Sequence, residues 1–145
     1  MTETLHPEEQ ITSIIFVRHG HTKETEAGKL YTDHHSLLTE RGLEQAQNAA
    51  AWLKNETVEL LLCSEAARVA GSAAIIGKAI GLQAQIINGL NEQHVGDWEG
   101  RTYLEIKKAD PDLYRSWSQD PIRNRAPNGE SIEDVYSRVR SDIND

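Results

Sequence analysis

Residues 11–22 read ITSIIFVRHGHT, and this stretch decides how the rest of the chain is interpreted. Its first seven residues are an almost continuous β-branched and apolar run, which is typical of a strand covered on both faces of a sheet. The run ends at Arg18, His19 and Gly20. Because ligands bind at the carboxyl ends of parallel strands, Arg18 and His19 become candidate functional residues.

Strand and helix patterns alternate along the rest of the chain. Thr39 and Ser131 are placed to begin helices, Ser131 as part of a capping box with Asp134, and Gly81 is placed to end one. Helical patterns cover residues 39–55, 66–80, 102–118 (broken at Asp110-Pro111) and 131 onward, whereas the apolar runs 58–63 and 83–87 predict two more strands. The order predicts an α/β fold with three layers, in which helices flank a mostly parallel sheet.

The composition bounds the class of protein. With 145 residues we expect a flexible polar tail at residues 1–10 and a single domain at 11–145. The net charge of −8 argues against a nucleic-acid surface, although a phosphate pocket needs only a few local cations. There is no signal-like start and no apolar run of about 20 residues, so we expect no membrane segment and a cytoplasmic location. The single cysteine, Cys63, excludes an internal disulfide and fits a reducing compartment.

Each predicted strand is followed by side chains suited to phosphate chemistry. Arg18 and His19 follow the first strand, Ser64 and Arg68 follow the second, and Glu92 follows the third. A neutral histidine is nucleophilic when its other ring nitrogen is held as a donor, and guanidinium groups grip phosphoryl oxygens. A carboxylic acid can protonate the leaving alkoxide and then accept a proton from water. The set indicates phosphoryl transfer through a phosphohistidine, with no metal and no other cofactor.

Other interpretations of these residue types are weaker. The pairs His19–His21 and His34–His35 invite a metal site, but no spacing such as His-Glu-x-x-His supports one. Cys63 at a strand end is expected to be a buried small residue rather than a nucleophile. The indoles of Trp98 and Trp117 are expected to pack inside the protein rather than to stack on bases.

Several blocks of the sequence resemble the histidine phosphatase superfamily, also called phosphoglycerate mutase-like. The stretch FVRHGHT at 16–22 is similar to its signature, and the match continues in the family's order through LTERGLEQA at 38–46, CSEAAR at 63–68, LNE at 90–92, GDWEG at 96–100 and PNGES at 127–131. The resemblance implies a phosphoglycerate mutase-like fold. The form of the GDWEG block is similar to the phosphatase branch rather than the mutase branch.

The resemblance also implies roles for individual residues. His19 would be the phosphorylated nucleophile, Arg18 and Arg68 would bind the phosphoryl group and take part in catalysis, and Glu92 would be the proton donor. The family's first loop carries a Trp-Asn pair whose asparagine helps to bind phosphate, but this chain has Lys23-Glu24-Thr25 there. That contact is therefore missing or is supplied by Thr25, and Glu24 must point away from a bound phosphate. His21 is expected to line the rim of the substrate site.

The end of the chain is a second departure from the family. The family has a further strand that carries a second active-site histidine and lies beside the nucleophile's strand. This chain ends at Asp145, and none of its six histidines follows the PNGES block, so we expect a domain that lacks its C-terminal portion. Without that strand, sheet hydrogen-bonding groups stay unpaired unless another chain covers them, which favours a homodimer.

The favoured function is hydrolysis of a small phosphorylated metabolite through phospho-His19. One alternative is a mutase that moves phosphate between hydroxyls of one sugar acid. The other is an inactive truncated domain that binds phosphorylated ligands or partner proteins without turnover. Substrate specificity is expected in the loop at residues 24–37 and in residues 101–128.

Overall fold

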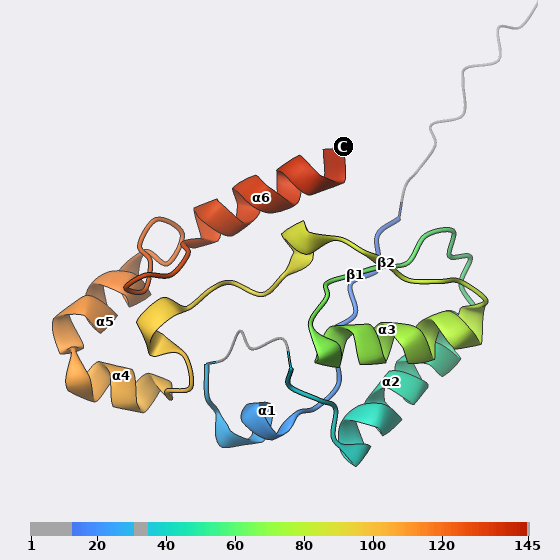
Figure 1. Ribbon diagram of the computed structural model, residues 1–145, viewed down its shortest axis with the longest axis horizontal. Helices are drawn as coiled ribbons and strands as arrows, with labels where there is room; N and C mark the ends of the chain where they lie inside the picture. Colours follow the sequence, from blue (N-terminus) through green and yellow to red (C-terminus); the bar gives the residue numbers. More distant parts are fainter. Residues whose placement is uncertain (1–12, 31–34, 145) are drawn as a thin grey trace, which may run out of the picture.

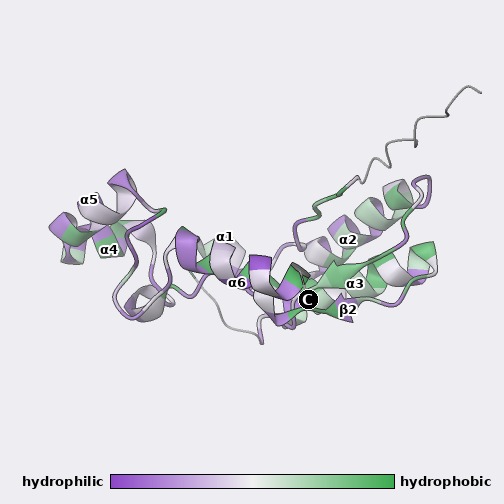
Figure 2. Ribbon diagram, turned by 90° about the horizontal axis from the view of Figure 1, so that it is seen from above, coloured by the Kyte–Doolittle hydropathy of each residue, from purple (hydrophilic) through white to green (hydrophobic). Residues whose placement is uncertain are grey.

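The computed structural model describes residues 13–30 and 35–144, so the predicted tail at 1–10 lies outside the described residues. This part of the chain is helix-rich around a small parallel sheet (Figure 1). In chain order the α-helices are α1 (Lys23–Ala27), α2 (Glu40–Leu53), α3 (Ala67–Ile80), α4 (Tyr103–Ala109), α5 (Pro111–Gln119) and α6 (Ile132–Asn144). Figures 1 and 2 show α2 and α3 side by side at one end and α4 and α5 at the other, with α1 and α6 between them.

A parallel strand–helix–strand unit forms one end of the molecule. Strand β1 (Leu62–Cys63) is followed by α3 and then by β2 (Gln85–Ile86), and the two strands pair in parallel. The apolar face of α3 packs on α2, where Ala50, Leu53 and Ile76 are buried. Two of the predicted strands therefore form, each shorter than the apolar run that predicted it, and the unit is of the expected α/β type.

The predicted first strand does not form in the described residues. Residues 13–17 are outside any strand, and the side chains of Ile14 and Phe16 are 72% and 91% exposed. The sequence prediction of a strand at 11–17 is wrong for this part of the run, and Ile11 lies outside the described residues. The physical reason is that a strand depends on its neighbours, because β-propensity reflects packing on a sheet more than a preference of the isolated backbone.

A second core lies at the opposite end, around α4 and α5. Trp98, Ile106 and Ala126 are buried there. Two short 3₁₀ turns precede α4 in the chain, η1 (Asn88–Leu90) and η2 (Gly96–Trp98), and Trp98 is the last residue of η2. The rings of Trp98 and Trp117 meet edge to face with centroids 5.2 Å apart. Both tryptophans thus pack within the protein, as the sequence predicted.

The predicted helix boundaries agree with the structure because they depend on local hydrogen bonds. The Thr39 hydroxyl accepts from the N–H of Gly42 at the start of α2. The Ser131 hydroxyl accepts from the N–H of Asp134, and the Ser131 N–H donates to the Asp134 carboxylate, which is the expected capping box. Gly81 ends α3 with a φ of +77°, a conformation that costs glycine little. The predicted break at Asp110-Pro111 separates α4 from α5.

Candidate active site

A cleft of about 300 Å³ lies where the segment that ends at His19, the start of α3, the loop after η1 and the start of α6 meet. Its walls combine the predicted nucleophile, one predicted phosphate-binding arginine and the predicted proton donor with apolar side chains. The lining residues are His19, Ser64, Arg68, Val69, Leu90, Asn91, Glu92, Gln93, Ile132 and Val135. Residues from four separate segments of the sequence therefore share one cavity, although the predicted first strand is absent from residues 13–17.

His19 is half-buried at this cleft, and its backbone neighbour fixes its tautomer. Nδ1 lies 2.7 Å from the carbonyl oxygen of Gly20, and since a carbonyl can only accept, Nδ1 carries the proton. Nε2 of the neutral ring then has its lone pair available. The local sequence supplies this arrangement, because Gly20 directly follows the histidine.

The surroundings of His19 favour its neutral form. Burial is the largest cause that lowers the pKa of the imidazole below 6.5, and the positive charges of Arg68 and Arg18 lower it further. The hydrogen bond to Gly20 and the charge of Glu92 act in the opposite direction. The balance keeps the ring unprotonated at neutral pH, which is the form that a nucleophile requires.

The two predicted phosphate-binding arginines differ in their position. Arg68 lies in the first turn of α3 and is 1% exposed, so its guanidinium group is almost entirely out of contact with water. Arg18 is exposed and lies outside the lining of the cleft, although its charge affects the pKa of His19. Glu92 lines the cleft from the loop after η1, and its Oε1 accepts a hydrogen bond of 3.0 Å from the N–H of Gln93.

A close backbone contact holds the His19 loop against α2 and α3. The N–H of Gly20 donates to the hydroxyl of Ser72, which in turn donates to the carbonyl of Arg68. A Cβ on Gly20 would lie 2.2 Å from the carbonyl oxygen of Gly42, so the contact needs glycine. Ser72 thus ties the nucleophile's loop to the helix that carries Arg68. The sequence analysis missed Ser72, and its signal was a single hydroxyl among the small and apolar residues 70–76 of the helix.

The two predicted substrate-binding residues of the first loop lie outside the lining of this cleft. Thr25 is exposed in α1, and its N–H donates to the Thr22 hydroxyl. A hydrogen bond of 2.9 Å joins Nδ1 of His21 to the Thr39 hydroxyl, and the His21 N–H donates to the side chain of Gln45. His21 thereby fastens the loop to the start of α2.

Glu24 is the acid that the sequence placed near a phosphate site. Its carboxylate accepts a hydrogen bond from the Ser36 hydroxyl, and this bond is the largest cause that lowers the pKa of Glu24. The charge of Arg68 lowers this pKa further. The carboxylate is therefore ionised at neutral pH and engaged by Ser36.

Cys63 is buried, and burial raises the pKa of its thiol. A thiol of this kind is a weak nucleophile, in agreement with the expectation of a structural residue. Within the described ranges, 13–30 and 35–144, His, Cys, Asp and Glu side chains form no group of three or more that could hold a metal ion. The pair His34–His35 is only partly described, because His34 lies outside these ranges.

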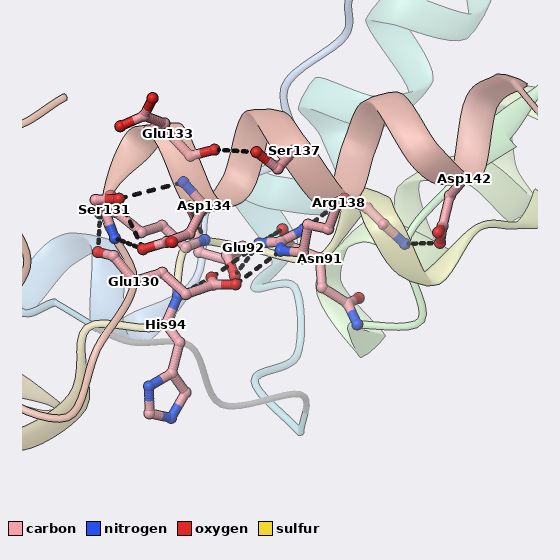
Figure 3. Close-up of polar contacts among 12 residues, drawn as sticks. Asn91, Glu92, His94, Glu130, Ser131, Glu133, Asp134, Ser137, Arg138 and Asp142 are labelled. Carbon is pink, nitrogen blue, oxygen red and sulfur yellow. Dashed lines mark hydrogen bonds and ion pairs between the residues drawn. The ribbon is translucent and has the colours of Figure 1, made fainter. Parts of the chain in front are cut away.

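The helix α6 contributes side chains that the sequence analysis did not single out. Arg138 donates to the backbone carbonyls of Asn91 and Glu92 in the cleft-lining loop and pairs with the carboxylate of Glu130 (Figure 3). Asp142 accepts from the N–H of Gly89 in the same loop. A clue was present in the PNGES block, which contains Glu130, but the partner of that glutamate is not visible in a sequence. None of the helices in the described residues has the length and apolarity needed to cross a bilayer.

Comparison with known proteins identifies the class. Residues 14–145 match the family model of the histidine phosphatase superfamily, branch 1, and the chain belongs to this family. The chain is 37% identical over 124 residues to an adenosylcobalamin/alpha-ribazole phosphatase of Escherichia coli, covering 85% of this chain and 61% of that protein. It is 31% identical over 129 residues to a glucosyl-3-phosphoglycerate phosphatase of Mycolicibacterium vanbaalenii, covering 89% and 57%.

Solved structures of phosphatases have the same fold. A mycobacterial glucosyl-3-phosphoglycerate phosphatase in complex with vanadate superimposes with a TM-score of 0.80 at 29% identity, over 87% of this chain and 60% of that one. An alpha-ribazole-5′-phosphate phosphatase of Escherichia coli gives 0.74 at 34% identity, over 88% and 63%. The fold is therefore phosphoglycerate mutase-like, as the sequence predicted. The chain spans about 60% of the length of the relatives that it matches.

Proposed function

We propose that this chain hydrolyses a small phosphomonoester through a phosphohistidine intermediate on His19. One observation carries the proposal: His19, Arg68 and Glu92 border the same cleft, and the Gly20 carbonyl holds the Nδ1 proton of His19 so that Nε2 has its lone pair available. A nucleophile, a buried cation and a proton donor are the groups that phosphoryl transfer to an enzyme side chain requires.

The reaction has two steps. In the first, Nε2 of His19 attacks phosphorus, the bond between phosphorus and the ester oxygen breaks, and Glu92 gives its proton to the leaving oxygen. The ring gains positive charge, which the hydrogen bond from Nδ1 to the Gly20 carbonyl stabilises. In the second step, water attacks phosphorus, the Glu92 carboxylate takes a proton from that water, and the phosphorus–nitrogen bond breaks. Phosphate leaves, and His19 and Glu92 return to their starting forms.

The two arginines would neutralise the charge on the phosphoryl oxygens. Arg68 is the stronger candidate for direct binding because it is buried and lines the cleft. Fixed cations in a site of low dielectric stabilise developing charge far better than the same groups do in water. Arg18 contributes from a more exposed position, whereas a phosphate contact by Thr25 and a rim position for His21 stay predictions.

The named relatives support the reaction rather than one substrate. They are described as phosphatases of alpha-ribazole and of glucosyl-3-phosphoglycerate, and one mycobacterial relative holds vanadate in its structure. We therefore propose a small phosphorylated metabolite as the substrate class. A cytoplasmic location belongs to the same proposal, since the only cysteine of the chain is a buried thiol.

The test is hydrolysis of an aryl phosphate, with a metal chelator present, by the chain and by its His19→Ala variant. We expect turnover in the chain, turnover at background in the variant, and no effect of the chelator. Mass spectrometry of the rapidly quenched reaction should find a phosphoryl group on His19.

A matched histidine serves as the control. His94 is exposed and lies outside the lining of the cleft, so His94→Ala should retain the turnover of the unaltered chain. Equal rates for the chain and His19→Ala would contradict the proposal. A phosphoenzyme that persists in water and passes its phosphate only to a sugar acid would indicate the mutase instead.

A further inference from the structure

The loop that carries Glu92 is fastened to α6 by one guanidinium group (Figure 3). Nη2 of Arg138 donates to the backbone carbonyls of Asn91 and Glu92, at 2.8 and 3.1 Å, and Nη1 donates to the carbonyl of Gly89. Three carbonyls within four residues thus share one donor group. The contact holds the backbone of the proposed proton donor itself, and not only that of its neighbours.

Glu130 holds the residues that follow Glu92 in the same loop. Its carboxylate pairs with Arg138, where Nε lies 2.9 Å from Oε1 and Nη2 lies 3.0 Å from Oε2. Oε2 also accepts from the N–H of His94 at 2.9 Å, and the backbone of Glu130 accepts from the side chain of Gln93. Arg138 therefore holds the backbone up to Glu92, and Glu130 holds the two residues that follow it.

The pair is better shielded from water than the pair that Arg115 forms with Asp112 on α5. The side chains of Arg138 and Glu130 are 25% and 27% exposed, compared with 66% and 87% for Arg115 and Asp112. The hydrogen bond from Arg138 is the largest cause that lowers the pKa of Glu130, so the carboxylate is charged at neutral pH. A shielded bidentate pair defines a geometry, whereas an exposed pair contributes little.

The side chain of Glu92 needs such support. It is exposed, and the bond that is described for its carboxylate goes to the adjacent N–H of Gln93. The chain around it is a short 3₁₀ turn followed by a loop, so no long helix or strand fixes its direction. A displacement of about 1 Å in a reacting group can cost roughly 10²-fold in rate.

We propose that Arg138, paired with Glu130, is a positioning residue that holds the backbone of Glu92 so that its carboxyl group faces the leaving oxygen at the His19 cleft. This inference rests on the proposed function and deepens it, because it states how the proton donor is kept in place. It predicts a defect in proton donation, which differs from the general loss that a damaged fold would cause.

The experiment compares two esters that need the proton donor to different degrees. An alkyl phosphate leaves as a basic alkoxide and needs protonation, whereas a nitro-substituted aryl phosphate leaves as a stable anion. Arg138→Met keeps a side chain of similar length and removes the guanidinium. We expect this variant to lose about 10- to 100-fold in kcat/KM on the alkyl phosphate and less than about threefold on the aryl phosphate.

Five further variants, one of them a double variant, make the result specific. Glu92→Gln should show the same dependence on the leaving group, and Arg138→Met should add little to it in the double variant, because both act on one step. Glu130→Gln and Arg138→Lys should show the effect in weaker form. Arg140→Met makes the same chemical change on the same helix and should leave both rates unchanged. Circular dichroism checks that each variant is folded.

The outcomes separate the inference from the proposed function. Equal losses on both esters in Arg138→Met, or losses that multiply with those of Glu92→Gln, would overturn the positioning role while His19-dependent turnover stands. Unchanged rates in Arg138→Met would overturn it as well. Absence of His19-dependent turnover in the unaltered chain would overturn the proposed function, and the positioning role with it.

Discussion

At the scale of single residues, the structure gives His19 its properties through contacts that mostly come from elsewhere in the chain. Gly20 sets the tautomer locally, but burial and Arg68 depend on how the chain folds around the cleft. The sequence singled out His19, Arg68 and Glu92 from the ends of predicted strands, and the structure brings the three to one cavity. It leaves Thr25 and His21 outside that cavity, because these residues fasten the loop to itself and to α2.

The pKa of His19 gives a prediction at this scale. In the folded protein the pKa of His19 lies below 6.5, the ordinary value that the ring has in the unfolded chain. Between these two pKa values the unfolded chain therefore binds more protons than the folded protein. The contribution of His19 to the free energy of unfolding therefore rises with pH across that window. It is fully present above pH 6.5 and is lost as the pH falls through the pKa of the folded protein's His19. A titration of the His19 ring by NMR should have its midpoint below 6.5.

Two variants test the causes of that shift. Arg18→Met removes a positive charge and should raise the midpoint of the His19 titration, whereas Glu92→Gln removes a negative charge and should lower it. Shifts in the same direction in both variants would disprove the electrostatic explanation.

At the scale of elements, helix boundaries were the most predictable feature, because each depends on bonds within a few residues. Thr39, Ser131 and Gly81 occupy the capping positions that their residue types indicated. Strands were less predictable. The runs at 58–63 and 83–87 pair over only two residues each, and residues 13–17 do not pair at all in the described structure.

Two glycines of α3 offer a matched prediction on stability. A Cβ on Gly71 would meet the side chain of Leu38 at 3.4 Å, an ordinary contact, so Gly71→Ala should stabilise the protein by about 0.5–1 kcal/mol through helix propensity. A Cβ on Gly77 would lie 2.4 Å from the carbonyl oxygen of Leu82. Gly77→Ala should therefore destabilise it by about 1–3 kcal/mol.

Urea unfolding followed by circular dichroism measures both free energies. If Gly77→Ala is as stable as Gly71→Ala, then the close approach between the end of α3 and the following turn does not exist in solution.

At the scale of the whole molecule, apolar side chains remain uncovered on the described surface. Ile14 and Phe16, in the segment before His19, are 72% and 91% exposed, and Ile86 of β2 is 59% exposed. Exposed apolar patches beside unpaired strand edges favour association with another chain. We expect the chain to self-associate at tens of micromolar, as measured by light scattering, and Phe16→Ser to weaken that association.

Leu104→Ser is the matched control, because Leu104 is 75% exposed but lies in α4 at the other end of the molecule (Figure 1). This variant should associate like the unaltered chain. A clean monomer of the unaltered chain at that concentration would contradict the expectation.

The sequence by itself determined the family, the α/β order, the helix boundaries and the candidate site residues His19, Arg68 and Glu92. Helix boundaries can be predicted because capping bonds involve residues within a few positions of each other, and the family can be predicted because each of its motifs is a short run of residues. Tertiary structure alone decided which apolar runs pair as strands and that Arg138 holds the Glu92 loop. Arg138 and Asn91 are separated by 47 positions in the chain, and only the packing of α6 against η1 brings them together. Strand pairing and a shielded ion pair both depend on partners that no local pattern specifies.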